Sequence, residues 1–156
     1  MILDANTILS GALTAAGVVT GQSVTGTNTS VLSTNTYDLG VARDLGKGAA
    51  LEVAIETIVA ASGGTSVQFQ LIEADDAALS VNVQVIVQTD AFPVATLVAG
   101  TQIPLHVDRV DPYVARRYIG LRYQLVGAVA AGSYFAAVAL NIADKQVNYT
   151  SGFAVL

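Results

Sequence analysis

The sequence has no cysteine, no tryptophan and a single histidine, His106. The absence of cysteine excludes disulfide bonds, thiolate metal sites and a cysteine nucleophile. One histidine cannot form a multi-histidine metal site, and it leaves little scope for histidine-based catalysis. We therefore expect a protein with no cofactor, no bound metal and no enzymatic activity.

Charged side chains are also scarce in this protein. Only 12% of the 156 residues are charged, which is about half the usual fraction. The seven Lys and Arg residues leave a net charge of −5, which is poorly suited to binding a phosphate backbone, so nucleic acid is not an expected partner. Hydrophobic residues nevertheless make up 53% of the chain. A surface with so few charges is expected where another protein covers much of it.

One uncharged run, residues 123–143, is long enough to cross a bilayer. It contains Gln124, Asn141 and two glycines, which disfavour insertion, and its apolar residues alternate. The run therefore predicts two strands around a turn at residues 131–133. Asp4 stands where a secretory signal carries Lys or Arg, which disfavours a signal peptide. We expect no membrane partner.

The N-terminal residues differ in character from the rest of the chain. Residues 5–37 carry no charge, and Thr20–Ser30 is rich in Thr and Gly. This composition predicts an extended arm over residues 1–36 that orders against a partner. Within the arm, Asp4 is a suitable cap for a short helix over residues 4–16.

From Tyr37 onward the hydrophobic pattern has a period of two residues, which predicts β-strands. Gly63-Gly64 and Asp111-Pro112 predict turns between strands. The sequence therefore predicts an all-β domain over residues 37–156, an antiparallel β-sandwich of about eight strands, for which a jelly roll is a suitable architecture. The clearest alternations are at residues 51–59, 67–71, 81–87, 103–107, 119–125 and 134–142.

The acidic clusters are better interpreted as turns than as metal sites. Asp75-Asp76 and the pair Asp108 and Asp111 have oxygen ligands that calcium prefers. Neither pair lies in the ligand-dense, glycine-punctuated loop of a dedicated calcium site. Solvated turn residues are the favoured interpretation.

The remaining candidates for chemistry are Glu52, Glu56 and His106. The two glutamates alternate with apolar residues, which indicates a solvated strand face more than a carboxylate pair for glycoside hydrolysis. His106 lies between Leu105 and Val107, and no Gly-x-Ser-x-Gly nucleophile motif accompanies it. We expect no catalytic role for any of them.

One group of residues has the composition of a protein interface. Three arginines are interleaved with three tyrosines, and Arg and Tyr are the side chains that anchor protein interfaces. An equally weighted interpretation is that they cover a sheet face or pair with acids such as Asp44. The residues are Tyr113, Arg116, Arg117, Tyr118, Arg122 and Tyr123.

Several short stretches, in order along the chain, resemble the capsid cement proteins of tailed bacteriophages, the group typified by the Bordetella phage cement protein. This resemblance extends from Tyr37 to Ala143 and also includes the first few residues. The stretches are Met1–Ala5, Asp38–Gly40, Ala42–Gly48, Leu97–Gly100 and Arg117–Tyr123.

The resemblance implies a jelly-roll structural protein of the virion, made in the host bacterial cytoplasm and bound to the outer capsid surface. It would bind major capsid proteins of the HK97-like fold, clamp neighbouring capsomers and act as a homodimer. Its candidate interface residues here are Ile2, Leu3, Asp4, Arg43, Asp44, Tyr113, Arg116, Arg117, Tyr118 and Arg122.

The uncharged arm would lie over a neighbouring subunit and add edge strands to it. We expect deletion of residues 1–30 to weaken capsid binding and to leave the sandwich folded. Two alternatives stay open on the residues alone: a minor tail or fibre protein, and a carbohydrate-binding β-sandwich module. The carbohydrate-binding interpretation is less favoured because aromatic residues make up only 6% of the chain.

Overall fold

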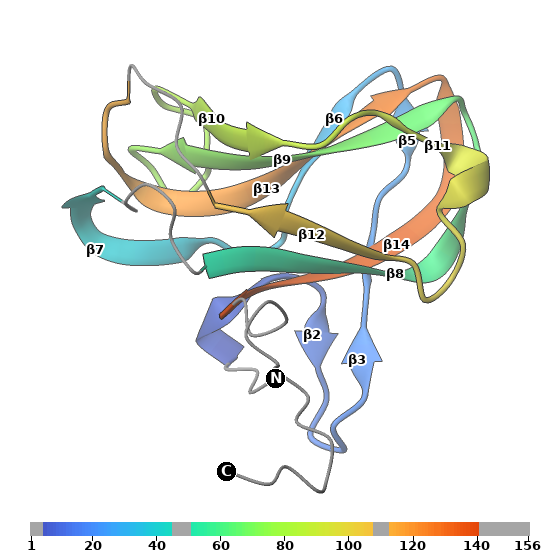
Figure 1. Cartoon of the computed structure of the whole chain (residues 1–156), viewed down its shortest axis with the longest axis horizontal. Coiled ribbons are helices and arrows are strands. Elements are labelled where there is room, and N and C mark those ends of the chain that lie inside the picture. Colours follow the sequence, from blue (N-terminus) through green and yellow to red (C-terminus); the bar gives the residue numbers. More distant parts are fainter. Residues whose placement is uncertain (1–4, 45–50, 108–112, 141–156) are drawn as a thin grey trace, which may run out of the picture.

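The computed structural model describes residues 5–44, 51–107 and 113–140. These residues form two antiparallel β-sheets that pack face to face, a separate two-stranded hairpin and two short 3₁₀ helices (Figure 1). The 3₁₀ helices are η1 (Ala5–Thr7) and η2 (Val94–Thr96). The predicted all-β antiparallel sandwich is confirmed, whereas its jelly-roll topology stays a prediction.

The first sheet is built around two long strands, β8 and β14. Its main order is β1-β14-β8-β12, and β4 and β5 also pair with β14. Its strands are β1 (Ile8–Ser10), β4 (Gln22–Ser23), β5 (Gly26–Thr27), β8 (Leu51–Gly63), β12 (Gln102–His106) and β14 (Ala128–Leu140).

The second sheet is built around β9 and β13. Its main order is β10-β9-β13-β6, with β11 also paired to β9 and β7 also paired to β13. Its strands are β6 (Ser30–Leu32), β7 (Tyr37–Arg43), β9 (Ser66–Ala74), β10 (Gln84–Gln88), β11 (Phe92–Pro93) and β13 (Arg116–Val126).

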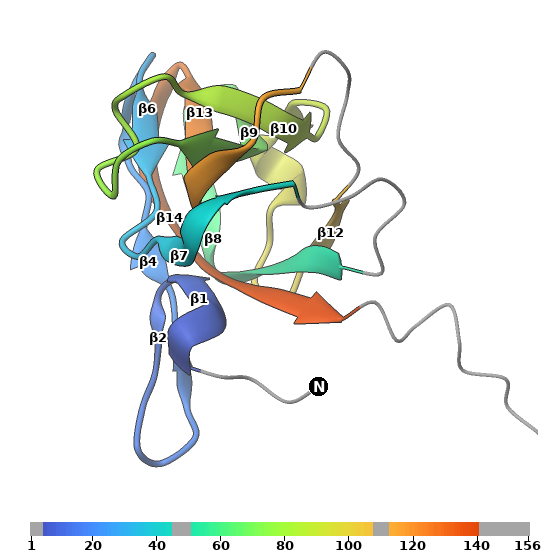
Figure 2. The same cartoon turned by 90° about the vertical axis from the view of Figure 1, so that its left-hand side faces the viewer.

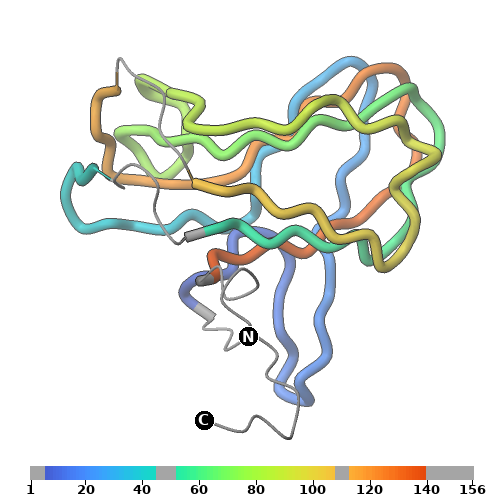
Figure 3. Tube along the Cα trace, in the orientation of Figure 1, coloured from blue at the N-terminus to red at the C-terminus, as the bar shows by residue number. Residues whose placement is uncertain are grey.

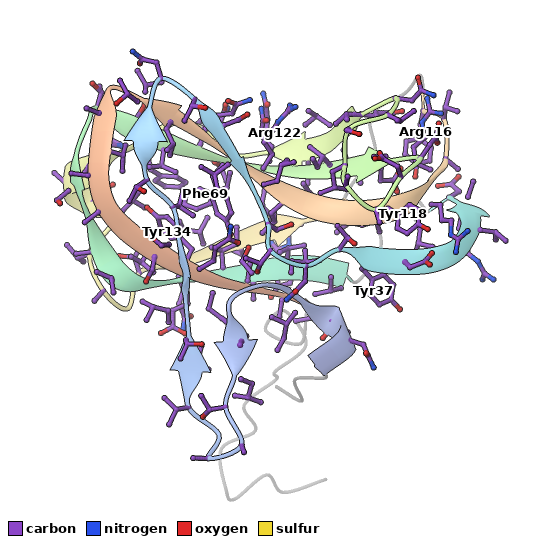
Figure 4. The ribbon with its side chains drawn as sticks, turned by 180° about the vertical axis from the view of Figure 1, so that it is seen from behind. Tyr37, Phe69, Arg116, Tyr118, Arg122 and Tyr134 are labelled. Atoms are coloured by element: carbon purple, nitrogen blue, oxygen red, sulfur yellow. The ribbon has the colours of Figure 1, made fainter. Side chains whose placement is uncertain are left out.

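The core lies between the two sheets and follows the alternation of the sequence. Successive side chains of a strand point to opposite faces, so alternate residues over much of the long strands are buried in the same cluster. Three aromatic rings lie at its centre: Phe69 of β9, Tyr123 of β13 and Tyr134 of β14. Figure 4 shows Phe69 and Tyr134 between the sheets. Aliphatic members of the cluster are Val53, Ile55, Val67, Leu71, Ile103, Leu105, Ile119, Leu121 and Leu125.

Two glycine turns carry the chain from one sheet to the other. Gly63 and Gly64 join β8 to β9 as predicted, both with φ of +69°. The turn predicted at residues 131–133 is wrong, because the chain turns at Gly127 and β14 continues through those residues with irregular register. Gly127 has a φ of +78°, and a Cβ there would lie 2.8 Å from the Cα of Gly64. The two turns therefore pack together, which only glycine permits.

The predicted helix over residues 4–16 is also wrong within the described residues. After η1 the chain forms β1, and Ile8 and Leu9 are buried on opposite sides of it. Leu9 enters the core between the sheets, whereas Ile8 packs on the outer face of the first sheet beside Phe135. Two consecutive apolar residues buried on opposite sides fit a strand better than a helix.

Most of the predicted arm belongs to the sandwich. Beyond β1, the strands β4 and β5 pair with β14, β6 pairs with β13, and Val24 is fully buried in the core. The hairpin of β2 (Ala12–Leu13) and β3 (Val19–Thr20) extends away from the sandwich, on the side of β8 and β14 (Figures 1 and 2). The Cα trace in Figure 3 shows the same projection. For the described residues 5–36, the predicted arm is therefore corrected to a hairpin within an integrated N-terminal segment, and residues 1–4 of the predicted arm lie outside the described part.

This correction also changes the expected effect of deleting residues 1–30. The deletion would remove β1, β4 and β5 together with the buried Leu9 and Val24, so it is not expected to leave the sandwich folded.

The strand predicted over residues 81–87 is shorter than expected. Only Gln84–Gln88 pairs with β9, and Val81 and Val83 are exposed. Asp76 explains the difference, because its carboxylate accepts hydrogen bonds from the backbone N–H groups of Ser80 and Val81, each at 2.8 Å. This local turn takes the preceding residues out of the sheet and confirms the predicted exposed loop.

No helix among the described residues is both long and apolar enough to cross a membrane. The uncharged run that the sequence analysis assigned to strands lies in β13 and β14 as far as Leu140, and its last residues lie outside the described part.

Leu9 gives a direct test of this integration of the N-terminal segment. Because its side chain is fully buried, we expect Leu9→Ala to lower the free energy of unfolding by about 2–5 kcal/mol. Leu13 in the hairpin is 39% exposed, so Leu13→Ala should change it by less than about 0.5 kcal/mol. Urea unfolding of both variants measures the difference. If Leu9→Ala lowered the free energy of unfolding as little as Leu13→Ala does, the segment would not be part of the cooperative fold.

Candidate protein-binding surface

The predicted interface residues gather where β7 and β13 run side by side. Arg43 ends β7 and Asp44 follows it, while Arg116 to Arg122 lie on β13. Tyr113 lies shortly before β13, with its hydroxyl 3.4 Å from the Arg43 carbonyl oxygen. Figure 4 shows Arg116, Tyr118 and Arg122 along this part of the second sheet. Ile2, Leu3 and Asp4 lie outside the described residues.

Arg117 holds β7 to β13 through a two-point ion pair. Its Nε and Nη2 donate to the two carboxylate oxygens of Asp38 at 2.7 and 2.8 Å. The guanidinium also lies 5.0 Å from the centre of the Tyr118 ring, a cation–π contact. Asp38 accepts a further bond from the Gly40 N–H at 2.7 Å. The hydrogen bond from Arg117, followed by that from Gly40, lowers the pKa of Asp38 to about 2.

Arg116 ties β13 to the loop between β9 and β10. Its Nη1 lies 3.1 and 3.2 Å from the two carboxylate oxygens of Asp75. Asp75 also accepts a 2.7 Å hydrogen bond from the Asn82 side chain, on the far side of the same loop. The bond from Asn82 is the largest cause of the lowered pKa of Asp75, and Arg116 adds to it.

Tyr113 is the partner of a buried carboxylate that sequence analysis missed. Glu73 of β9 is fully buried, and the Tyr113 hydroxyl lies 2.8 and 2.9 Å from its two oxygens, to which it donates its one proton. Burial raises the pKa of Glu73, and the nearby charge of Asp44 acts in the same direction. The hydrogen bonds from Tyr113 and from the Arg116 backbone oppose this rise in the pKa.

Arg122 belongs to a polar ladder on the outer face of the second sheet. Its Nε donates to the Gln70 side-chain oxygen at 2.7 Å, and the Gln70 amide donates to Gln88 at 2.8 Å. The ladder therefore crosses β13, β9 and β10. These contacts fix the side chains across three strands.

Tyr123 does not belong to the surface group. It lies in the core, where its hydroxyl donates to the Ser10 hydroxyl of β1 at 2.6 Å. Burial raises the pKa of Tyr123, and the hydrogen bond to Ser10 only partly opposes this effect. The strand alternation contains a signal for this placement, because residues 118 and 123 differ by an odd number and so face opposite sides of β13.

The other candidate residues of the described part contact neighbouring residues of the chain. Asp76 organises a turn, and the His106 imidazole lies 3.5 Å from the Glu52 carboxylate across the β12–β8 pair. Within the part of the chain that the structure describes, no group of three His, Cys, Asp or Glu residues is placed to hold a metal ion. Asp108 and Asp111 lie outside that part.

Two arginines of this surface are held by ion pairs within the chain. Arg116 and Arg117 are paired with acids, as the second interpretation of the sequence proposed, although the acids are Asp75 and Asp38. Their charges join a strand to a loop and a strand to a strand. The role of this surface as an interface stays a prediction.

A family model for Bbp16 matches residues 7–138. The chain belongs to the Bbp16 family. The match begins in η1 and ends in β14, so it includes both sheets and the hairpin. No curated protein matches the sequence.

Bbp16 is a Bordetella phage protein, so the resemblance to the phage cement group is confirmed. Membership of the Bbp16 family also indicates a phage structural protein associated with the virion.

The Asp38–Arg117 pair predicts a loss of stability in acid. Because the pKa of Asp38 is lowered to about 2 in the folded protein, its contribution is present above the unfolded pKa near 3.8 and is lost as the pH falls through about 2. Asp38→Asn and Arg117→Gln should each flatten the stability profile over this pH range. Thermal unfolding between pH 5 and pH 2 measures it. An unchanged acid slope in both variants would contradict the assignment.

Glu73 predicts the opposite pH dependence. Its raised pKa means that its contribution is greatest below the unfolded pKa near 4.5 and is lost as the pH rises through the folded pKa. Glu73→Gln stays neutral and keeps an acceptor for Tyr113, so its stability relative to the wild type should rise with pH.

Tyr113→Phe tests the same site from the other side. It removes a donor to a buried carboxylate and should cost about 1–3 kcal/mol at neutral pH. The cost should be smaller in the Glu73→Gln background. Urea unfolding of the four proteins at pH 4.5 and 7.5 measures the coupling, and additive effects at both pH values would contradict it.

Proposed function

We propose that this protein is a capsid cement protein. It binds the outer surface of an icosahedral phage capsid and clamps neighbouring major capsid proteins of the HK97-like fold. The observation that carries the proposal is the Bbp16 family match over residues 7–138. The match spans nearly all of the described sandwich, so the proposal concerns the whole folded body.

The construction of the sandwich supports this mechanical role. A clamp transmits force between the subunits that it joins, so its own elements must not slide apart. Here Arg117 joins β7 to β13, Arg116 joins β13 to a loop, and Tyr123 joins β13 to β1 of the other sheet. These ties cross strand boundaries at positions where the backbone ladder is irregular or ends.

The proposed mechanism is additive. Each bound subunit buries surface on two neighbouring capsomers, so the joint between them opens only if those contacts are lost. Many weak contacts repeated over a closed shell act together. The proposed partners are the major capsid protein and a second copy of this chain, with neither nucleic acid nor membrane.

The alternatives differ in what supports them. A minor tail or fibre protein fits the same family match, and copy number in the virion separates it from a cement protein. The carbohydrate-binding alternative has less support, because each aromatic side chain among the described residues is buried or half-buried, whereas sugar sites use exposed aromatic platforms. We also propose that this protein has no catalytic role.

The test is a density map of the purified virion at side-chain resolution, together with the copy number of this chain. We expect outer-surface subunits that bridge capsomers, in numbers comparable to those of the major capsid protein. A few copies confined to the tail would favour the fibre alternative. A shell that carries none of this chain would overturn the cement proposal.

A further inference from the structure

We propose that Glu73 and Tyr113 form a proton-controlled latch that fastens the end of β7 to β9. When the Glu73 carboxyl group carries a proton, hydrogen bonds run from Glu73 through the Tyr113 hydroxyl to the Arg43 carbonyl at the end of β7. When Glu73 loses that proton, the bond to Arg43 is lost. The latch is a property of the chain alone and does not depend on the proposed capsid role.

The latch follows from a count of protons around the Tyr113 hydroxyl. The two Glu73 oxygens lie 2.9 and 2.8 Å from it, and the Arg43 carbonyl oxygen lies 3.4 Å from it. A carbonyl oxygen and an ionised carboxylate only accept hydrogen bonds, and a phenol has one proton to donate. With Glu73 ionised, the shorter contacts with the charged carboxylate take that proton. The Arg43 carbonyl then receives none from Tyr113.

Protonation of Glu73 supplies the missing hydrogen. A protonated carboxyl group is itself a donor, so its O–H points to the Tyr113 oxygen, and the Tyr113 O–H turns to the Arg43 carbonyl. A Glu73 oxygen still accepts from the Arg116 backbone N–H. The contact between Tyr113 and Arg43 is therefore a hydrogen bond only when Glu73 is protonated.

The position of Glu73 favours the protonated state. Its side chain is fully buried, and burial is the largest cause of its raised pKa. On the flanking strands its register partners are uncharged, Gln84 on β10 and Ile119 on β13. Neither can neutralise an ionised Glu73.

Among the described residues, the charged groups that act on Glu73 are Asp44 and Arg116. The Asp44 charge raises the pKa of Glu73, whereas the Arg116 charge lowers it. Arg116 is also paired with Asp75, its Nη1 lying 3.1 Å from a carboxylate oxygen of that residue. The positive charge nearest to Glu73 is therefore shared with a second acid.

The latch is closed in acid and opens as the pH rises. As the pH passes through the raised pKa of Glu73, the carboxyl proton passes to water, Tyr113 donates back to the carboxylate, and the Arg43 carbonyl loses its bond. The pKa values of Asp38 and Asp75 are lowered. These two neighbours of the same surface therefore stay ionised over the range in which Glu73 titrates.

The latch acts on the surface that carries the predicted interface residues. Arg43 is the last residue of β7, and its register partner on β13 is Arg116. The register of this strand pair shifts between Arg116 and Tyr118, which Figure 4 shows on the same side of the molecule as the end of β7. A hydrogen bond to Arg43 therefore holds β7 where the backbone ladder is irregular. By linkage, a partner that prefers one state of this surface would shift the pKa of Glu73.

The test is an NMR titration of the purified full chain from pH 4 to pH 8. The carbon-13 shifts of the Glu73 carboxyl, the hydroxyl-bearing ring carbon of Tyr113 and the Arg43 carbonyl report the three groups of the latch. We expect all three to change with one apparent pKa. Amide hydrogen exchange, corrected for its intrinsic pH dependence, should show the end of β7 about two- to tenfold better protected on the acid side, as one net hydrogen bond predicts.

Tyr113→Phe removes the middle of the latch. Glu73 should still titrate in this variant, but the Arg43 carbonyl should no longer follow it. Tyr118→Phe is the matched control, because it removes a tyrosine hydroxyl from β13, where the ring packs on the outer face of the sheet. This control should keep the response of Arg43.

Glu73→Gln should hold the latch closed at every pH. The amide offers an acceptor for the Arg116 N–H and a donor for the Tyr113 oxygen, as a protonated carboxyl group does. The Arg43 carbonyl should therefore keep its acid-side shift throughout. Asp44→Asn removes the ionisable group next to Arg43. It should lower the apparent pKa of Glu73, because the Asp44 charge raises it, and should leave the coupling to Arg43 in place.

Two results would overturn the latch. One is an Arg43 carbonyl that does not change with Glu73 in the wild type, and the other is an Arg43 carbonyl that follows Glu73 equally in Tyr113→Phe. Melting temperatures show which variants fold. If Tyr113→Phe does not fold, Glu73→Gln decides, because an Arg43 carbonyl with the high-pH shift of the wild type would contradict a closed latch. Capsid binding enters none of these measurements, so the cement proposal stands or fails separately.

Discussion

The contact among three aromatic rings between the sheets is the interaction on which the rest of the structure depends. Phe69 meets Tyr134 and Tyr123 edge to face, with ring centres 5.1 and 5.6 Å apart, and the two tyrosines stack at 5.5 Å. Such pairs add about 0.5–1.5 kcal/mol each beyond the area that they bury. Because Tyr123 also donates to Ser10, the same cluster fixes β1, and β1 sets where the hairpin leaves the body.

Charged and uncharged residues stabilise different parts of this protein. Arg116 and Arg117 form ion pairs within the chain, and these pairs hold β13 to a loop and to β7. Exposed pairs of this kind contribute little to stability singly, but they restrict the motion of irregular edges. The uncharged N-terminal segment instead supplies core residues and the projecting hairpin. The charged pairs and the uncharged N-terminal segment thus stabilise different parts of one small sandwich.

Strand alternation predicted the half-buried strands well, because residues such as Ile55, Leu105 and Leu121 each lie on the side of their strand that faces the core. The alternation failed where a local turn replaced the strand. The Asp76 carboxylate accepts a hydrogen bond from the Val81 N–H and holds Val81 in a turn, although the β-branched Val81 favours a strand. Alternation does carry the information that Tyr123 faces the core. The Tyr113–Glu73 contact joins residues 40 positions apart, and no local pattern indicates it. The hairpin was obscured because its Thr, Ala and Gly residues resemble a flexible linker.

The difference between a flexible arm and a preformed hairpin changes the energetics of assembly. An arm that orders on its partner loses about 1–2 kcal/mol of backbone entropy for each residue fixed, which weakens a small contact severely. The hairpin loses that entropy during folding, when Thr14 and Gly17 close its tip. A contact made through its exposed side chains would therefore need no further ordering of its backbone. In the proposed cement role, contacts that are modest singly would act together through their repetition over a closed shell.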